Sequence, residues 1–296
     1  MSSYNTATIT KAQIAESLNS KGYAVIENVL NNKEIEYSKE LFYDWLESNK
    51  QLKEKHPKID PHGIFRYGEI GHQRHAWYIR TRKSVQKPFQ DIWNTNELVS
   101  SFDGCCWIPN NFKGEDKLWT HTDQAPNKKG LTCIQGFVSL TNNEERTFCV
   151  YEGSHKLHES YMLTKGLTGS RNWELIDEQF LSSISHTKKA LHVTAGSMVL
   201  WDSRTFHHNR YGKDGEERIV QYVSFLPKNG AKNTPKMTEK RRKYLEDRRT
   251  TSHWAYPIKV NSKQPRTYGN NDLLVDYNVL KRPILEDLKE DIERLV

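Results

Sequence analysis

Two short stretches far apart in the chain carry residues whose types and spacing suit metal binding. The first contains His121 and Asp123, and the second ends in His207. Successive side chains of a β-strand point to opposite faces, so His121 and Asp123 would leave the same face of a strand and could share one metal ion. Two histidines and one carboxylate, with the other positions left open, form the facial triad that holds non-heme Fe(II). A His-X-Asp sequence alone is common by chance, so the prediction depends on the downstream stretch.

The downstream stretch has the pattern of a strand that delivers a third ligand. An apolar run over residues 198–201 follows a turn-prone Ala-Gly-Ser sequence and leads to His207. Eleven residues later, Arg218 opens another strand-like run, and an antiparallel hairpin would return its guanidinium to the metal. The planar fork of arginine binds a carboxylate through two hydrogen bonds, which suits the distal carboxylate of 2-oxoglutarate chelated to iron at its other end. The sequence therefore predicts one site built from three ligands and one arginine.

These residues resemble the phytanoyl-CoA dioxygenase-like family of Fe(II)/2-oxoglutarate oxygenases. The likeness covers roughly residues 10–227, and one turn differs, because residues 142–146 read Asn-Asn-Glu-Glu-Arg where the family usually has an Asn/Asp-Gly pair. The matching segments are the Gly-Tyr-Ala-Val-Ile run at 22–26 after a short helix, His121-Thr-Asp123, the Gly-Ser-His-Lys turn at 153–156, the Leu-Trp-Asp-Ser-Arg run at 200–204 that leads into His207, and Arg218.

The resemblance implies a fold and a set of further site residues. The fold is mainly β with flanking helices around a double-stranded β-helix, a jelly-roll core of the cupin type. The cofactors it implies are Fe(II) and 2-oxoglutarate, with O₂ as co-substrate. It also implies that Asn209 contacts the 2-oxoglutarate carboxylate and that Gln135 contacts the cofactor or the substrate; a structural hydrogen bond remains the alternative for Gln135. His207 is preferred over His208 as the third ligand, because the family's spacing to Arg218 is counted from it. His208 should face away.

Length and composition limit the class of protein. The chain has 296 residues, and none of its apolar runs approaches the ~20 residues needed to cross a bilayer. The first residues lack the basic and apolar regions of a secretory signal, so we expect a cytoplasmic protein that does not enter a membrane. The four cysteines are few for this length and lack metal-site spacing, which predicts buried, reduced thiols.

We expect one domain in three parts. Residues 1–100 hold N-terminal helices and strands that extend the sheet, residues 101–227 the double-stranded β-helix, and residues 228–296 a basic C-terminal extension packed on the core or over the pocket. The net charge is +7, yet residues 228–266 alone hold twelve Lys and Arg against three Asp and Glu, so the rest of the chain is slightly acidic. This extension could be a solvated helix face, a footprint for an anionic ligand or a dimer contact. The protein is expected to be a monomer or a homodimer.

Several segments have patterns that place them around the core. A capping box at Thr10 predicts a short helix, and Asn32 is expected to cap a longer one. Prolines and glycines predict a long loop over residues 51–71. Further expected elements are strands at 23–30, 101–107 and 132–140, and helices at 87–99, at 238–249 and from about 283.

The segment 72–82 groups three arginines and two histidines around aromatic residues. One interpretation is a strand with a solvated cationic face. The other places Tyr78, Arg80 or Arg82 in the substrate pocket, where they would bind acidic groups of a small molecule. Both interpretations stay open at the level of sequence.

These observations favour an Fe(II)/2-oxoglutarate-dependent dioxygenase. We expect it to oxidise an unactivated C–H bond of a small, acidic metabolite in a biosynthetic pathway, by hydroxylation, desaturation or oxidative cyclisation. Asp123 takes the position that a halide would need, which argues against halogenation. One alternative is an oxygenase that acts on nucleic acid or on protein side chains presented by the basic extension. A second is a non-catalytic cupin-like binding protein, which the intact triad and Arg218 argue against.

Overall fold

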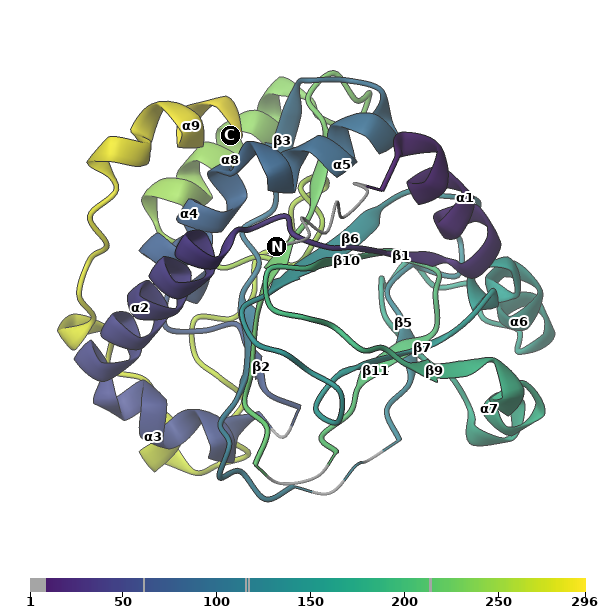
Figure 1. The fold of residues 1–296 in the computed structure, drawn as a ribbon, viewed down its shortest axis with the longest axis horizontal. Helices are drawn as coiled ribbons and strands as arrows, with labels where there is room; N and C mark the ends of the chain where they lie inside the picture. Colours follow the sequence, from purple (N-terminus) through teal and green to yellow (C-terminus); the bar gives the residue numbers. More distant parts are fainter. Residues whose placement is uncertain (1–8, 61, 115, 117, 213–214) are drawn as a thin grey trace, which may run out of the picture.

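The computed structural model describes residues 9–296 except 61, 115, 117, 213 and 214, and it contains two large antiparallel sheets (Figure 1). The strands are β1 Tyr23–Ile26, β2 Ile64–Phe65, β3 Leu98–Ser100, β4 Cys105–Ile108, β5 His121–Thr122, β6 Ile134–Ser139, β7 Phe148–Tyr151, β8 Glu174–Leu175, β9 Lys188–Ala190, β10 Met198–Asp202, β11 His207–Asn209, β12 Arg218–Val223 and β13 Phe225–Pro227. The six-stranded sheet has the order β1-β10-β6-β12-β4-β2, and the five-stranded sheet has the order β8-β5-β11-β7-β9. Strands β13 and β3 pair separately.

Helices flank the sheets on their outer sides. Thr10 and Gln13 form the expected capping box of the first helix, whereas the second is capped by Asn31 and not by Asn32. The helices are α1 Lys11–Lys21, α2 Asn32–Ser48, α3 Lys50–Ile59, α4 Arg74–Thr81, α5 Lys83–Trp93, α6 His158–Thr164, α7 Glu178–Ser183, α8 Pro235–Glu246 and α9 Lys289–Arg294.

Apolar side chains fill the space between the two sheets. Phe137 of β6 and Phe148 of β7 come from different sheets, and their ring centroids lie 5.6 Å apart in an edge-to-face contact. Trp201 of β10 also contacts Phe148, at 4.7 Å. Because alternate residues of a strand share a face, Val199 on β10 belongs to the same cluster. The inner faces of both sheets are therefore joined by one core, which holds the site described below.

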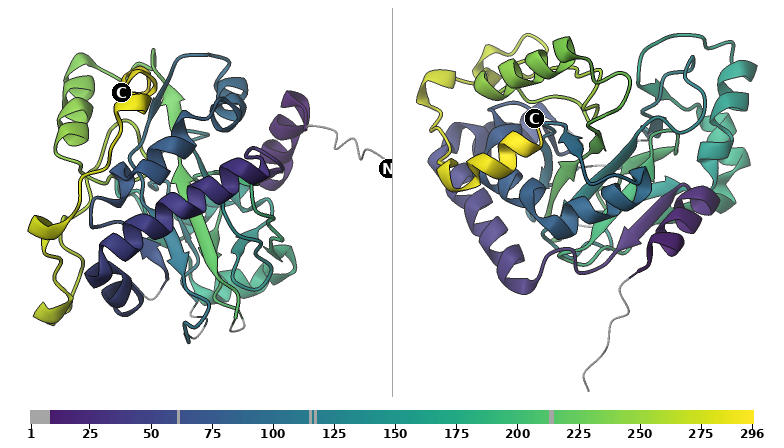
Figure 2. Two further views of the ribbon diagram at one scale, coloured as in Figure 1. Left: turned by 60° about the vertical axis from the view of Figure 1, so that its left-hand side comes forward. Right: turned by 90° about the horizontal axis from the view of Figure 1, so that it is seen from above.

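The other face of the six-stranded sheet is covered by a layer of helices. Phe42 of α2 and Phe89 of α5 are fully buried against this face, in one cluster with Leu200 and Ile219 of the sheet. In Figure 1 the five-stranded sheet lies on the opposite side of the six-stranded sheet from this layer. Figure 2 views the molecule from two other directions and shows that α2 runs across the sheet. Helices thus support the sheet that carries Gln135 and Arg218.

Further expectations for the N-terminal third are also wrong. The expected loop over residues 51–71 begins with helix α3, because Leu52, His56 and Ile59 form a buried stripe at helical spacing despite Pro57. The segment 72–82, for which one interpretation was a strand, contains helix α4. Residues on several sides of α4 are buried, so the segment lacks the apolar stripe and opposite polar face that would have indicated a helix.

The C-terminal extension packs onto the core through its own cluster of buried residues. Leu288, Ile292 and Val296 join Trp77 of α4 and Phe102 in this cluster. All four cysteines are free and buried, as expected. Among the helices of the described residues, none is long and apolar enough to cross a membrane. The expected cytoplasmic location stays a prediction.

Candidate metal centre

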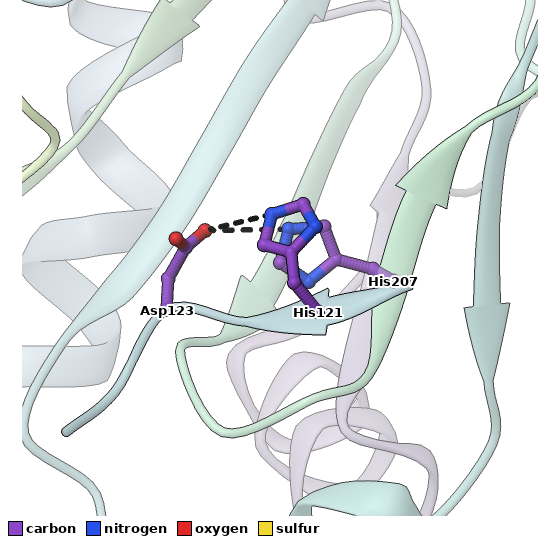
Figure 3. Close-up of side chains that lie close together, drawn as sticks. All are labelled: His121, Asp123 and His207. Carbon is purple, nitrogen blue, oxygen red and sulfur yellow. Dashed lines mark ion pairs between the residues drawn. The ribbon is translucent and has the colours of Figure 1, made fainter. Parts of the chain in front are cut away.

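His121, Asp123 and His207 meet at one point between the sheets (Figure 3). Strands β5 and β11 are antiparallel neighbours, and their register pairs His121 directly with His207. Directly opposed residues on one face have neighbouring side chains, and the two imidazole centroids lie 4.4 Å apart. Asp123 follows β5, with its backbone N–H bonded to the Ser203 carbonyl. One ligand atom from each of the three residues lies within 4.8 Å of the others.

Hydrogen bonds orient both histidines for metal binding. His121 Nδ1 lies 3.0 Å from the Trp119 carbonyl oxygen, and His207 Nδ1 lies 2.9 Å from the Thr205 carbonyl oxygen. Since a carbonyl only accepts, each Nδ1 carries the proton, and each Nε2 has a free lone pair. These Nε2 atoms lie 3.6 Å and 3.3 Å from Asp123 Oδ2. A carbonyl that fixes the tautomer in this way is typical of metal-ligating histidine.

The environment holds Asp123 and His207 in the protonation states that bind metal. Burial on its own would raise the pKa of Asp123, but His121 and His207 outweigh it and hold that pKa well below the usual range. Burial, and then the neighbouring His121, lowers the pKa of His207. The carboxylate is therefore ionised and the His207 imidazole neutral at neutral pH. A metal ion can bind both groups without displacing a proton.

Gln135 of β6 and a group of aromatic rings surround the ligands. The Gln135 Nε2 atom donates a hydrogen bond to Asp123 Oδ2 over 3.1 Å. Gln135 therefore contacts the carboxylate of a candidate metal ligand. The contact with the cofactor that we expected from the sequence stays a prediction. Trp119 and Trp173 stack near His121, with centroids at 4.9 Å and 5.7 Å. The sequence alone did not single out these two tryptophans, because nothing in their local pattern separates them from ordinary core residues.

Arg218 lies at the start of β12, with 1% of its surface exposed. Its Nη1 donates to Asn209 Oδ1 over 2.7 Å, and its guanidinium lies 5.4 Å from the Phe137 ring centroid. Asn209 in turn donates to the Tyr222 hydroxyl over 3.3 Å. Among the described residues, Nε and Nη2 of Arg218 have no hydrogen-bond partner, although both are buried. Two adjacent unpaired donors on one guanidinium form a site for a carboxylate.

His208 turns away from the triad, as expected. Its Nδ1 atom lies 2.9 Å from the Thr120 hydroxyl, and burial lowers its pKa to about 3. Alternation along β11 explains this orientation, because His207 and Asn209 share the face that looks toward the ligands and Arg218. The geometry favours His207 as the ligand.

The structure does not bring Tyr78, Arg80 and Arg82 into described contact with the triad. Arg80 is fully buried and donates to the backbone carbonyls of Gly71 and Asp103 at 2.5 Å and 2.6 Å. The guanidinium of Arg82 stacks over the Tyr78 ring at 4.2 Å. For Arg80, the described bonds go to the protein's own backbone, so its contact with substrate stays a prediction without geometric support.

Several basic residues of the C-terminal extension bind groups of the same chain. Arg248 pairs with the buried Glu69 at 2.6 Å, and Arg242 pairs with Glu293 at 2.9 Å. Arg241 is fully buried, with burial lowering its pKa to about 10, and it donates to backbone carbonyls. Part of the basic charge therefore holds the extension in place.

Comparison with known proteins supports the fold. No protein-family profile matches the chain. The Ava biosynthesis cluster protein O of Aspergillus versicolor is 28% identical over 225 residues, which cover 71% of this chain and 73% of that protein. The structure of EctD from S. alaskensis with 2-oxoglutarate and 5-hydroxyectoine aligns with a TM-score of 0.52 at 16% identity, covering 76% of this chain and 79% of EctD. HygX from Streptomyces hygroscopicus with nickel, 2-oxoglutarate and hygromycin B aligns with a TM-score of 0.50 at 16% identity, covering 75% and 88%.

At these identities the structural likeness establishes the fold alone. The chain shares its arrangement of antiparallel sheets and flanking helices with proteins whose structures hold 2-oxoglutarate. The resemblance noted in the sequence is thus confirmed at the level of the fold. Activity, cofactor and substrate depend on the site itself.

Proposed function

We propose that this protein is an Fe(II)- and 2-oxoglutarate-dependent dioxygenase that oxidises a C–H bond of a small molecule. The observation that carries the proposal is the cluster of His121, Asp123 and His207, whose ligand atoms lie within 4.8 Å of one another and whose histidines both present Nε2. Two histidines and one carboxylate on one side of a metal leave the other positions for cofactor and O₂. The fold shared with proteins that bind 2-oxoglutarate supports the same conclusion.

The residues fit both cofactors. His121, Asp123 and His207 would hold iron, and Gln135 would orient the Asp123 carboxylate by the bond it already makes. Arg218 would bind the distal carboxylate of 2-oxoglutarate through Nε and Nη2, the two buried donors that lack a partner among the described residues. When bound, iron and 2-oxoglutarate supply the oxidation: O₂ is reduced, 2-oxoglutarate yields succinate and CO₂, and a substrate C–H bond is oxidised.

The protein's own groups set the conditions for this chemistry. The ligands lie between two apolar inner faces, and Trp119, Trp173, Phe148 and Trp201 surround the histidines and exclude bulk water. Exclusion of water strengthens the attraction between Arg218 and a carboxylate. Asn209 fixes the guanidinium plane through its bond to Nη1, which leaves the opposite edge of the fork for the cofactor.

For the substrate, we propose a small molecule in a biosynthetic pathway. EctD and HygX were solved with 5-hydroxyectoine and hygromycin B, and the curated relative is a biosynthesis cluster protein. Hydroxylation is the default reaction, with desaturation or oxidative cyclisation as outcomes of the same site. The carboxylate character of the substrate stays a prediction. We also propose that the two sheets form the double-stranded β-helix implied by the sequence.

The direct test is succinate release by purified protein supplied with Fe(II), 2-oxoglutarate and O₂. Even without substrate, such an enzyme should release succinate slowly, and His121→Ala should lose both this release and its bound iron. Absence of release from the wild-type protein, together with unchanged iron content in His121→Ala, would refute the proposal. The alternative of a nucleic-acid substrate predicts salt-dependent binding of an oligonucleotide. The internal ion pairs of Arg242 and Arg248 disfavour it.

A further inference from the structure

The C-terminal extension reaches the core beside the metal centre through the segment Thr250–Ala255, called here the inner segment. The Thr250 hydroxyl accepts from the Gly71 backbone N–H, and Thr251 and Phe102 exchange two hydrogen bonds of 2.9 Å. Thr251 is 1% exposed. The inner segment is therefore held at residue 102, just before strand β4.

Further contacts hold the inner segment on its other side. The Trp254 ring is buried and lies 3.7 Å from the Lys128 ammonium, which is a close cation–π contact. The Ala255 carbonyl accepts from the buried Arg241. The Cys133 thiol lies 4.0 Å from the His253 carbonyl oxygen. Cys133 directly precedes β6, the strand that carries Gln135, so His253 is placed at the end of β6 nearest to Asp123.

The His253 side chain lies within electrostatic reach of all three metal-binding residues. Burial is the main cause that lowers the pKa of His253 to about 4; His207 and His121 lower it further, whereas the Asp123 carboxylate opposes the shift. Its imidazole is therefore neutral, with one nitrogen that donates and one that accepts. The His253 Nε2 atom is buried and has no hydrogen-bond partner among the described residues. An unsatisfied buried polar atom destabilises the protein, so a bound group that pairs with it is favoured.

A second buried group with an unpaired atom lies next to the anchor of the inner segment. Asp103 follows Phe102, is 6% exposed, and has no described partner for Oδ1. Burial raises the pKa of Asp103 to about 7, and the Asp123 carboxylate adds to this shift. His253 and Asp103 thus each have an unpaired buried atom, and they belong to the two segments that the hydrogen bonds between Thr251 and Phe102 join. Both side chains lie near the metal ligands.

Strand register separates this region from the Arg218 fork. Arg218 pairs with Ile108 at one end of β4, whereas Phe102 precedes Cys105 at the other end. The Arg218 side chain contacts Asn209, two residues beyond the ligand His207. His253 instead lies beside Cys133, close to Gln135 and Asp123. Arg218 therefore lies toward the triad from one end of β4, and the inner segment lies toward it from the other end.

We propose that His253 of the C-terminal extension is a substrate-positioning residue, whose Nε2 atom hydrogen-bonds a hydroxyl or carbonyl group of the substrate beside the metal. This inference rests on the proposed function, because it assigns the second end of the pocket once Arg218 takes 2-oxoglutarate. A neutral imidazole can donate a hydrogen bond to a carbonyl or hydroxyl oxygen, or accept one from a hydroxyl group. The extension then serves as a wall of the substrate pocket, with Asp103 beside it.

The placement of His253 can be tested with Co(II) as the probe metal. Protein labelled with ¹⁵N in its histidine rings should show, on adding Co(II) alone, paramagnetic shifts for rings near the metal, and one of the shifted signals should be that of His253, which is assigned by its loss in His253→Gln. His186, which is exposed, is the matched control, and its signal in the wild type should not move. A His253 signal that stays at its metal-free position would overturn the inference.

The role of His253 is tested by succinate release stimulated by a library of hydroxylated and carbonyl-bearing small molecules. For compounds that stimulate the wild type, His253→Ala should lower kcat/KM at least tenfold and raise the ratio of succinate to oxidised product. His253→Gln should recover part of this loss, because its amide reaches the position of Nε2, and His186→Ala should match the wild type. Equal stimulation in His253→Ala would overturn the assignment. Failure of the proposed function would appear differently, as a wild-type protein that releases no succinate at all.

Discussion

The two unpaired donors of Arg218 allow us to predict how much 2-oxoglutarate affinity is lost when Arg218 is replaced. Nε and Nη2 are buried without a described partner, so a bound carboxylate would form two charge-assisted hydrogen bonds with them. Each such bond contributes about 1.5–3 kcal/mol. Arg218→Lys keeps the charge but offers no fork, so it should lose about one bond and weaken 2-oxoglutarate binding by about 10- to 150-fold.

Arg218→Met should weaken binding further, because it removes both donors and the charge at similar side-chain length. The assay is anaerobic calorimetric titration of the Fe(II)-loaded protein with 2-oxoglutarate. Iron content should not change in either variant, because Arg218 is not a ligand. Arg210 is the matched control: it pairs with Glu145 at a partly exposed position, and Arg210→Lys should bind 2-oxoglutarate like the wild type. If Arg218→Met bound 2-oxoglutarate with wild-type affinity, the assignment of the fork would be refuted.

Three further predictions concern the groups around the site and the core. Gln135→Leu keeps the side-chain volume but removes the bond to the metal-binding carboxylate, so metal affinity measured against a competing chelator should fall about 10- to 100-fold. Arg80→Ala leaves two buried carbonyls without donors, and the free energy of unfolding in urea should fall by about 2–5 kcal/mol. Burial lowers the pKa values of His56, His72 and His75 to about 4, 3 and 3, so the unfolded chain binds more protons below pH 6.5. Stability should be fully present above that pH and decrease as the pH falls toward 4, by about 1.4 kcal/mol per pH unit for each histidine.

Matched variants sharpen the tests of Arg80 and of the buried histidines. His75 packs against Phe42 and Trp45, so His75→Phe should remove one histidine from the pH dependence and flatten it. Arg82→Ala, at a position stacked on Tyr78, should cost less stability than Arg80→Ala. Equal losses for the two arginine variants would contradict the structural role of Arg80. Unfolding energies that do not change between pH 7 and pH 5 would contradict neutral burial of the histidines.

The ligands of the metal centre could be predicted from the sequence, because residues close together in the sequence fix much of its geometry. The alternation of a strand places His121 beside Asp123, and the same rule turns His207 inward and His208 outward. The direct pairing of His121 with His207 depends on the register between β5 and β11, which no local pattern contains. The resemblance to a family provided that missing link.

The surroundings of the site could not be predicted in the same way. Gln135 was expected near the cofactor, but its bond to Asp123 depends on how β6 and the turn after β5 approach each other. The segment that forms helix α4 was not predicted as a helix, because burial on several sides gives a helix no polar face. The His253 carbonyl lies 4.0 Å from the Cys133 thiol although 120 residues separate the two in the sequence, and only the path of the extension brings them together. Contacts between residues so far apart in the sequence cannot be predicted from composition or from hydrophobic periodicity.

The most direct test compares iron binding in two variants of neighbouring residues. Wild-type protein titrated anaerobically with Fe(II) should bind one ion per chain, and His208→Ala should do the same, because His208 bonds Thr120 and faces away from the centre. His207→Ala should lose the high-affinity site, since His207 Nε2 faces Asp123 Oδ2 at 3.3 Å. Wild-type iron affinity in His207→Ala, or loss of iron in His208→Ala alone, would contradict the assignment of the metal centre.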